Sequence, residues 1–412
     1  MKKVNITDLK PGMYVVNPGD SWLMNPFLYT HEGKIEKETS IIENILDSGF
    51  LEVFIDLKRS DPDSLPPDWR VSDDTSTEDI LNRQSEEEKW NTPLPTVPIG
   101  EEMAEANKIC SETLDFVRGM IDGNHVEGEH VEIAQPFVER MLNSLQRNSN
   151  ALLGLCKLRM SDNYTYTHCV NVAVFTLSFA RGLGVPEDKL QLYGLAGLFH
   201  DIGKTMVPQE ILNAPRKLTN LEFEVMKTHS SRGYEQLSKI PGIFQEILDG
   251  TYQHHEKYNG LGYPLNLKSD EISMAGKLMA VVDIYDALTS QRVYKPAMPA
   301  VKVLGIMYGM REQDFHPGVV ESFIRMLGVY PVGTVVKLTD GSMAVVSGIN
   351  NNSGTKPQVV LIKDPKGKFV PRPVVIELEK EANLAIDTCL LPNQYNFKVD
   401  EILKNVQEIP PV

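Results

Sequence analysis

Histidine and aspartate side chains recur along one central stretch of the chain, and side chains of these types can bind metal ions. An adjacent pair, His200 and Asp201, is flanked by apolar residues such as Phe199 and Ile202. Imidazole and carboxylate groups are costly to bury unless they are paired or bound to metal. With five further residues, this pair forms one set of candidate metal ligands, which holds five of the nine histidines of the chain. Its further members are His168, His229, His254, His255 and Asp283.

This set of donors predicts the kind of metal and the kind of reaction. Imidazole with carboxylate suits Fe, Mn, Zn or Ni, and the set contains no thiolate. Neighbouring histidines on a helix point roughly 100° apart, so they can serve two nearby metals, or one metal and a substrate phosphate. An aspartate can bridge two ions through its two oxygens. Two metals about 3.5–4 Å apart lower the pKa of a bridging water and neutralise phosphoryl oxygens, which favours phosphodiester hydrolysis.

Three short motifs in a fixed order resemble those of a known family. The first runs from His200 to Lys204, the second is His254-His255-Glu256 followed by Gly262-Tyr263-Pro264, and the third runs from Asp283 to Tyr294. They resemble the motifs of HD-GYP phosphodiesterases, a branch of the HD superfamily of metal-dependent phosphohydrolases. The resemblance spans residues 152–330. Members of this family cleave cyclic di-GMP, and some cleave related cyclic dinucleotides such as 3′,3′-cGAMP, so this chain is expected to release the linear dinucleotide.

The resemblance implies the ligands and the number of metals. Members with three metals have a glutamate one helical turn before the first histidine, where this chain has Tyr164. We therefore expect two divalent transition metals, with Fe or Mn favoured and Ni or Zn also compatible, and attack by a hydroxide that bridges them. The implied metal ligands are His168, His200, Asp201, His229, His254, His255 and Asp283.

Other residues are expected to act on the substrate. Lys204 lies four residues after His200, one helical turn away on nearly the same face, and together with Asp201 it is the expected catalytic residue; the alternative is a lysine that caps a helix C-terminus. Arg292 and Lys295 match basic substrate-binding positions of the family, although the residues alone fit solvated charges equally well. The expected substrate-binding residues are Gly262, Tyr263, Pro264, Arg292 and Lys295.

Two other functions compete with hydrolysis. The chain could be a non-catalytic module that senses a cyclic dinucleotide or docks onto a diguanylate cyclase (GGDEF) protein. It could also be a nucleotidase of the HD type that acts on mononucleotides, which the Gly262-Tyr263-Pro264 loop argues against. Degenerate members usually lose ligands, so the retained set favours catalysis.

Composition narrows the class of protein. Hydrophobic residues make up 42% and charged residues 24% of the 412 residues, as in ordinary globular proteins. The net charge of −15 argues against binding of a nucleic acid polymer, which needs a basic surface, but allows a locally positive pocket. The four cysteines show no CxxC spacing, which is typical of a reducing compartment. Without a signal-like segment or a long apolar run, we expect a cytoplasmic protein away from membranes.

The chain divides by pattern into five segments with a mainly α fold. Residues 1–58 predict a small α/β domain, with strands at 12–16 and 51–55 and a short helix at 40–46. Residues 59–100 form an acidic, proline-rich linker. Two amphipathic helices in 101–150 either pack on the catalytic bundle or form a homodimer surface. Residues 151–330 are the helical catalytic domain. Residues 331–412 predict a β-rich appendage that begins with a hairpin at Asp340-Gly341.

Overall fold

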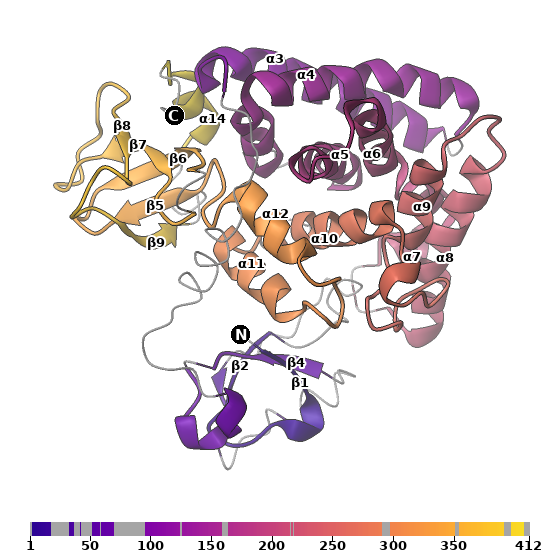
Figure 1. Cartoon of the computed structure of the whole chain (residues 1–412), viewed down its shortest axis with the longest axis horizontal. Coiled ribbons are helices and arrows are strands. Elements are labelled where there is room, and N and C mark those ends of the chain that lie inside the picture. Colours follow the sequence, from indigo (N-terminus) through magenta and orange to yellow (C-terminus); the bar gives the residue numbers. More distant parts are fainter. Residues whose placement is uncertain are drawn as a thin grey trace.

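Helices form the body of the molecule, and the N-terminal and C-terminal parts of the chain each form a small antiparallel sheet (Figure 1). The computed structural model describes residues 2–17, 33–36, 42, 52–57, 59–69, 95–123, 126–158, 164–214, 216, 218–290, 297–350, 354–390 and 397–407. The mainly α fold expected from the sequence is confirmed.

The N-terminal sheet has the strand order β1-β4-β2-β3 and is antiparallel throughout. Alternate apolar side chains such as Val53 and Ile55 are fully buried beneath it. Residues 59–69 continue this unit, because Leu65 packs into the same small core. The helix expected at 40–46 lies outside the described residues except for Ile42. The strands are β1 (Lys2–Asn5), β2 (Tyr14–Asn17), β3 (Gly33–Lys34) and β4 (Glu52–Ile55).

Two long helices, α3 (Ile99–Asp122) and α4 (Gly128–Leu158), run side by side across the top of the bundle in Figure 1. Their apolar residues recur at helical spacing and are buried, as Met103, Ala106 and Val138 show. Both helices pack against the helices that follow and share one core with them. Of the two roles left open by the sequence, packing on the bundle is therefore the one that these helices perform here.

The central helices surround α10, which is apolar on nearly every side. All its residues from Leu278 to Leu288 are buried, as expected for a helix in the middle of a bundle. It packs against α5, α9, α11 and α12. The helices are α5 (Tyr164–Gly182), α6 (Glu187–Phe199), α7 (Gln209–Leu212), α8 (Asn220–Leu237), α9 (Gln245–Gln253), α10 (Met274–Thr289), α11 (Ala300–Gly309) and α12 (Val319–Leu327), with 3₁₀ helix η5 (Ile202–Met206) after α6.

The C-terminal sheet has the order β8-β7-β6-β5-β9 and is antiparallel. The expected hairpin is present, and Gly341 at its turn has φ of +91°, a backbone conformation that favours glycine. The sequence did not predict β9 or α14. The elements are β5 (Val335–Leu338), β6 (Met343–Gly348), β7 (Gln358–Lys363), β8 (Val375–Glu377), β9 (Ile386–Leu390) and α14 (Val399–Lys404).

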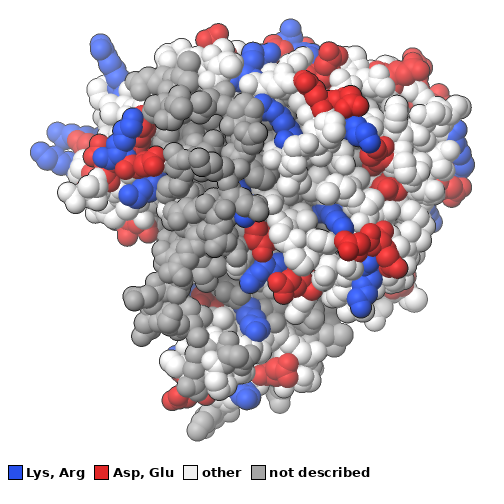
Figure 2. Space-filling view, in the orientation of Figure 1, with Lys and Arg blue, Asp and Glu red and all other residues white. Residues whose placement is uncertain are grey.

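Charge on the surface is mixed. Lysine and arginine are interspersed with aspartate and glutamate over the described part of the face in Figure 2. Within the described residues, none of the helices is both long enough and apolar enough to span a membrane.

Candidate metal centre

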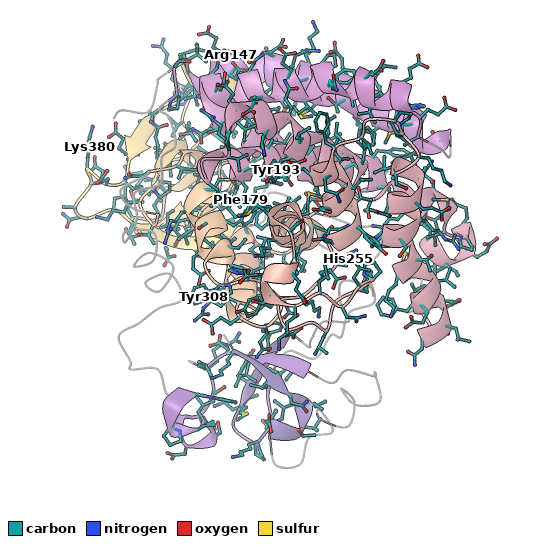
Figure 3. The ribbon with its side chains drawn as sticks, turned by 45° about the vertical axis from the view of Figure 1, so that its right-hand side comes forward. Arg147, Phe179, Tyr193, His255, Tyr308 and Lys380 are labelled. Carbon is teal, nitrogen blue, oxygen red and sulfur yellow. The ribbon has the colours of Figure 1, made fainter. Side chains whose placement is uncertain are left out.

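Five separate elements bring the seven expected ligands together inside the bundle. His168 lies on α5, His200 and Asp201 at the junction of α6 and η5, and His229 on α8. The remaining three are His254 and His255, directly after α9, and Asp283 on α10. Six of the seven are buried and His255 is nearly so. In Figure 3, His255 lies within the helical part of the molecule, away from Lys380 in the turn after β8.

One group of ligands consists of His168, His200 and Asp283, whose ligand atoms all lie within 4.8 Å of one another. His168 Nε2 is 3.0 Å from Asp283 Oδ1 and 3.3 Å from His200 Nε2. Burial disfavours the His168 imidazolium, but hydrogen bonds with Asp283 and Asp286 outweigh burial and raise the pKa of His168 to about 9. The group therefore has a strong preference for positive charge at its centre.

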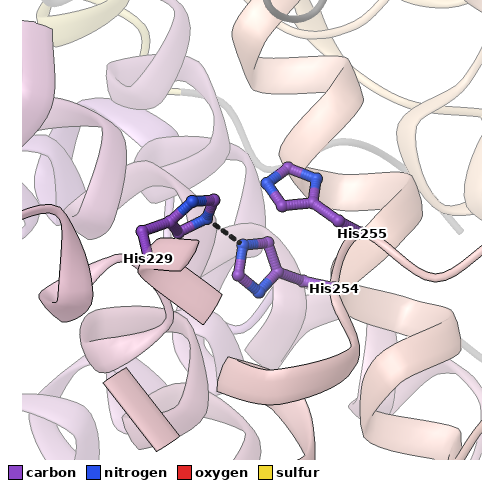
Figure 4. Close-up of side chains that lie close together, drawn as sticks. All are labelled: His229, His254 and His255. Atoms are coloured by element: carbon purple, nitrogen blue, oxygen red, sulfur yellow. Dashed lines mark hydrogen bonds between the residues drawn. The ribbon is translucent and has the colours of Figure 1, made fainter. Parts of the chain in front are cut away.

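The second group consists of His229, His254 and His255, which also lie within 4.8 Å of one another (Figure 4). His229 Nδ1 donates to Met226 O and His254 Nδ1 to Thr251 O, each at 2.8 Å. Burial, the largest cause in each case, lowers the pKa of His229 to about 4 and of His254 to about 3, so both rings are neutral at pH 7.

The tautomers of these two rings suit a cation beside their Nε2 atoms. A neutral imidazole carries one N–H, and here it is on Nδ1. The two Nε2 atoms, 3.1 Å apart, then direct lone pairs at each other. A cation between them would convert this repulsion into coordination, which is the usual role of neutral imidazole at a metal site.

Asp201 lies between the two groups. Its Oδ2 is 3.3 Å from His200 Nε2 and 3.6 Å from His168 Nε2, whereas its Oδ1 is 3.5 Å from His229 Nε2. Burial works against the charge, but His200 and Lys204 hold the pKa of Asp201 well below its usual range. Oδ1 is buried with no hydrogen-bond partner among the described residues. An ionised, buried and unpaired oxygen is costly, so its surroundings fit a bound cation.

Lys204 contacts this aspartate directly. Its Nζ donates to Asp201 Oδ2 at 2.5 Å, and the side chain is 25% exposed. The sequence placed Lys204 one helical turn after His200; in the structure α6 ends at Phe199 and Lys204 lies on the 3₁₀ helix η5. Gly203 of η5 lies so close to α8 that a Cβ would collide with His229 O, so glycine is required where the two backbones touch.

Asp286 is a further site residue whose role the sequence did not predict. Its Oδ2 accepts a hydrogen bond from His168 Nδ1 at 2.7 Å, and its Oδ1 accepts from Asn171 Nδ2 at 2.8 Å. Such a carboxylate fixes the tautomer of a metal-binding histidine and makes the ring a better donor. The available signal was spacing, because Asp286 follows Asp283 by one helical turn on α10 and so faces the same neighbour on α5.

The loop after His255 covers the second group. Glu256 accepts from Leu265 N at 2.6 Å and from Leu267 N at 2.9 Å, which closes the loop on itself. The Tyr263 ring stacks on His255, with centroids 4.7 Å apart, and half-buried Pro264 follows it. Of the expected substrate contacts, Tyr263 therefore lies directly beside the second ligand group.

The remaining expected substrate contacts are Gly262, Arg292 and Lys295. A Cβ on Gly262 would collide with the backbone of Glu256 and Lys257. The close approach that requires glycine here is therefore made by the chain itself. Arg292 and Lys295 lie outside the described residues.

Comparison with known proteins agrees with this geometry. Residues 140–319 match an HD domain, a class that binds divalent metal, residues 1–129 match a domain of unknown function (DUF3391), and residues 335–398 match a KOW domain associated with the HD domain. The chain is 32% identical over 381 residues to a cyclic di-GMP phosphodiesterase of Pseudomonas aeruginosa. This alignment covers 91% of this chain and 88% of that protein.

Other relatives match over the central region. A cyclic di-GMP phosphodiesterase of Vibrio cholerae is 36% identical over 46% of this chain and 43% of its own length. The 3'3'-cGAMP-specific phosphodiesterase 1 of the same organism is 30% identical over 47% of this chain and 45% of its own length. All three relatives are named phosphodiesterases; the names of two state cyclic di-GMP and the name of the third states 3'3'-cGAMP.

Proposed function

This chain belongs to the HD-GYP family of metal-dependent phosphodiesterases, and we propose that it hydrolyses one phosphodiester bond of a cyclic dinucleotide, with cyclic di-GMP as the substrate. The observation that carries the proposal is the position of Asp201 between two three-residue ligand groups, with Oδ1 buried and lacking a hydrogen-bond partner among the residues that the structure describes. The Pseudomonas aeruginosa relative, aligned along nearly the whole chain, supports cyclic di-GMP rather than 3′,3′-cGAMP as the substrate.

We infer two metal positions from the two groups. His168, His200, Asp283 and Asp201 Oδ2 would hold one metal, and His229, His254, His255 and Asp201 Oδ1 the other. Nitrogen and oxygen donors without thiolate fit Fe or Mn, and Ni or Zn is compatible. When bound, the metals would supply a water of lowered pKa and positive charge beside the scissile phosphate.

The residues around these positions would do the remaining work. The Lys204 ammonium, which contacts Asp201, would stabilise the phosphoryl oxygens, where negative charge grows as the bond to the leaving oxygen breaks. Tyr263 offers a ring beside His255 on which a base can stack. Arg292 and Lys295 stay predicted contacts to phosphate or to the edge of guanine. Docking onto a diguanylate cyclase, homodimer formation and a cytoplasmic location also stay predictions.

The test is to incubate metal-loaded protein with cyclic di-GMP and with 3′,3′-cGAMP and to separate the products. We expect the linear dinucleotide from cyclic di-GMP, and no product from the Asp201→Ala variant. His316→Ala is the matched control, because His316 pairs with the exposed Asp270 and lies outside the centre. Wild-type protein that carries both metals and leaves both nucleotides intact would favour the sensor alternative.

A further inference from the structure

A lysine and two aromatic rings border the second ligand group. Phe223 and Lys227 lie one helical turn apart on α8, and Tyr263 comes from the loop after His255. The Lys227 ammonium lies 5.2 Å from the centre of the Phe223 ring and 5.8 Å from that of Tyr263. The two rings meet edge to face, with centroids 6.5 Å apart. We call these three residues the α8 rim.

The α8 rim is next to the metal centre. Tyr263 stacks on His255 at 4.7 Å and lies 6.4 Å from the ring of His229. Only one aromatic ring therefore separates the Lys227 ammonium from the second ligand group. Lys204, the other lysine at the centre, lies on η5 and donates a hydrogen bond to Asp201. The two lysines therefore reach the centre from different elements.

The ammonium of Lys227 can be released to bind a ligand. Its ionic partner is Glu224, at 2.7 Å and three residues away, and the Glu224 side chain is 64% exposed. Ion pairs of this kind in water contribute little, about 0–1 kcal/mol. A ligand with two negative charges that approaches from the side of the metal centre would compete well for this ammonium. The long, flexible side chain of Lys227 can move toward such a ligand.

The proposed substrate has one group that the metal centre cannot bind. A cyclic dinucleotide carries two phosphates, and while one is being hydrolysed the other stays intact on the opposite side of the ring. We propose that Lys227 binds this second phosphate while Phe223 and Tyr263 pack against the adjoining base. The inference rests on the proposed function and adds to it a residue that selects cyclic dinucleotides over simple phosphodiesters. Stacking on aromatic rings tolerates any base, so the rim recognises the cyclic dinucleotide as a class.

The test compares two substrates on the same enzyme. Bis(p-nitrophenyl) phosphate has a scissile phosphodiester but no second phosphate. For Lys227→Met, we expect the ratio of kcat/KM for cyclic di-GMP to kcat/KM for bis(p-nitrophenyl) phosphate to fall roughly 10- to 100-fold, as the loss of a charged hydrogen bond would predict. The change should lie mainly in KM, and Lys227→Arg should restore most of the ratio because it restores the charge.

Lys239→Met is the matched control. Lys239 also forms a local ion pair, with Glu235 at 3.1 Å, on a side chain that is 71% exposed, compared with 26% for Lys227. We expect its ratio to equal that of the wild type, and the metal content and melting temperature of both methionine variants to stay native. A native ratio in Lys227→Met, in an enzyme whose wild type cleaves cyclic di-GMP, would overturn the inference and leave the proposed function standing. Wild-type protein that cleaves bis(p-nitrophenyl) phosphate but no cyclic dinucleotide would instead overturn the proposed function.

Discussion

Replacing Asp286 by asparagine should loosen one metal and leave the other in place. The carboxylate of Asp286 has two acceptor oxygens, one for His168 Nδ1 at 2.7 Å and one for Asn171 Nδ2 at 2.8 Å. An amide has a single acceptor oxygen, and its NH₂ group would face one of these two donors. The variant Asp286→Asn therefore loses one buried hydrogen bond to a charged group, which contributes roughly 1.5–3 kcal/mol.

That loss corresponds to a weakening of metal affinity of roughly 10- to 100-fold, the range usual for residues that orient a metal-binding histidine. Only the group containing His168 should be affected, because His229 and His254 are oriented by backbone carbonyls that the substitution keeps. Competition with a chelator, followed by metal counting, measures this. Asp270→Asn, in a solvent-exposed aspartate–histidine pair, is the control. Native affinity at both positions in Asp286→Asn would refute the reasoning.

Three further predictions concern other parts of the chain. Well-loaded protein should contain two transition metals per chain, and elemental analysis that finds three would contradict the two-group reading. Lys204→Met should lower kcat for cyclic di-GMP by roughly 10²–10³ with little change in KM, because its charge acts mainly on the transition state; an equal rise in KM would argue for ground-state binding. Burial lowers the pKa of the half-buried Lys157 to about 8 from an ordinary value of 10.5, so the unfolded chain binds more protons between these values and stability should rise with pH across that window. Lys157→Met should raise the free energy of unfolding at pH 7 by about 2 kcal/mol and by much less at pH 10.5; denaturant titrations that show equal gains at both pH values would refute this.

The ligand set was accessible from the sequence because its chemistry is unusual. Buried imidazoles beside carboxylates have few explanations other than a metal, and the order of the three motifs narrowed the family. The structure brings all seven predicted ligands together. Periodicity likewise predicted α3 and α4, since a long helix with one apolar face has a strong local signal.

Elements that depend on distant contacts were not predicted. The strand β9 is short and largely half-exposed, and it pairs with β5 about fifty residues earlier, so its own residues carry little pattern. The need for glycine at position 203 follows from its contact with the backbone of α8. The role of Asp286 likewise depends on α5 lying beside α10. In each case the cause is a partner far away in the sequence, which local patterns do not contain.

The metal centre gathers buried groups that are costly to bury unless they are paired or bound to metal. The Nε2 atoms of His229 and His254 face each other at 3.1 Å, and Asp201 Oδ1 has no hydrogen-bond partner among the described residues. Surrounding apolar helices hold these groups in place, since α10 and the adjoining face of α6 are almost wholly buried. Because the ligands come from five elements, a cation bound there would connect those elements and stabilise the folded chain by its binding free energy. The facing Nε2 lone pairs of His229 and His254 and the buried Asp201 Oδ1 are thus the groups that would make metal binding strong.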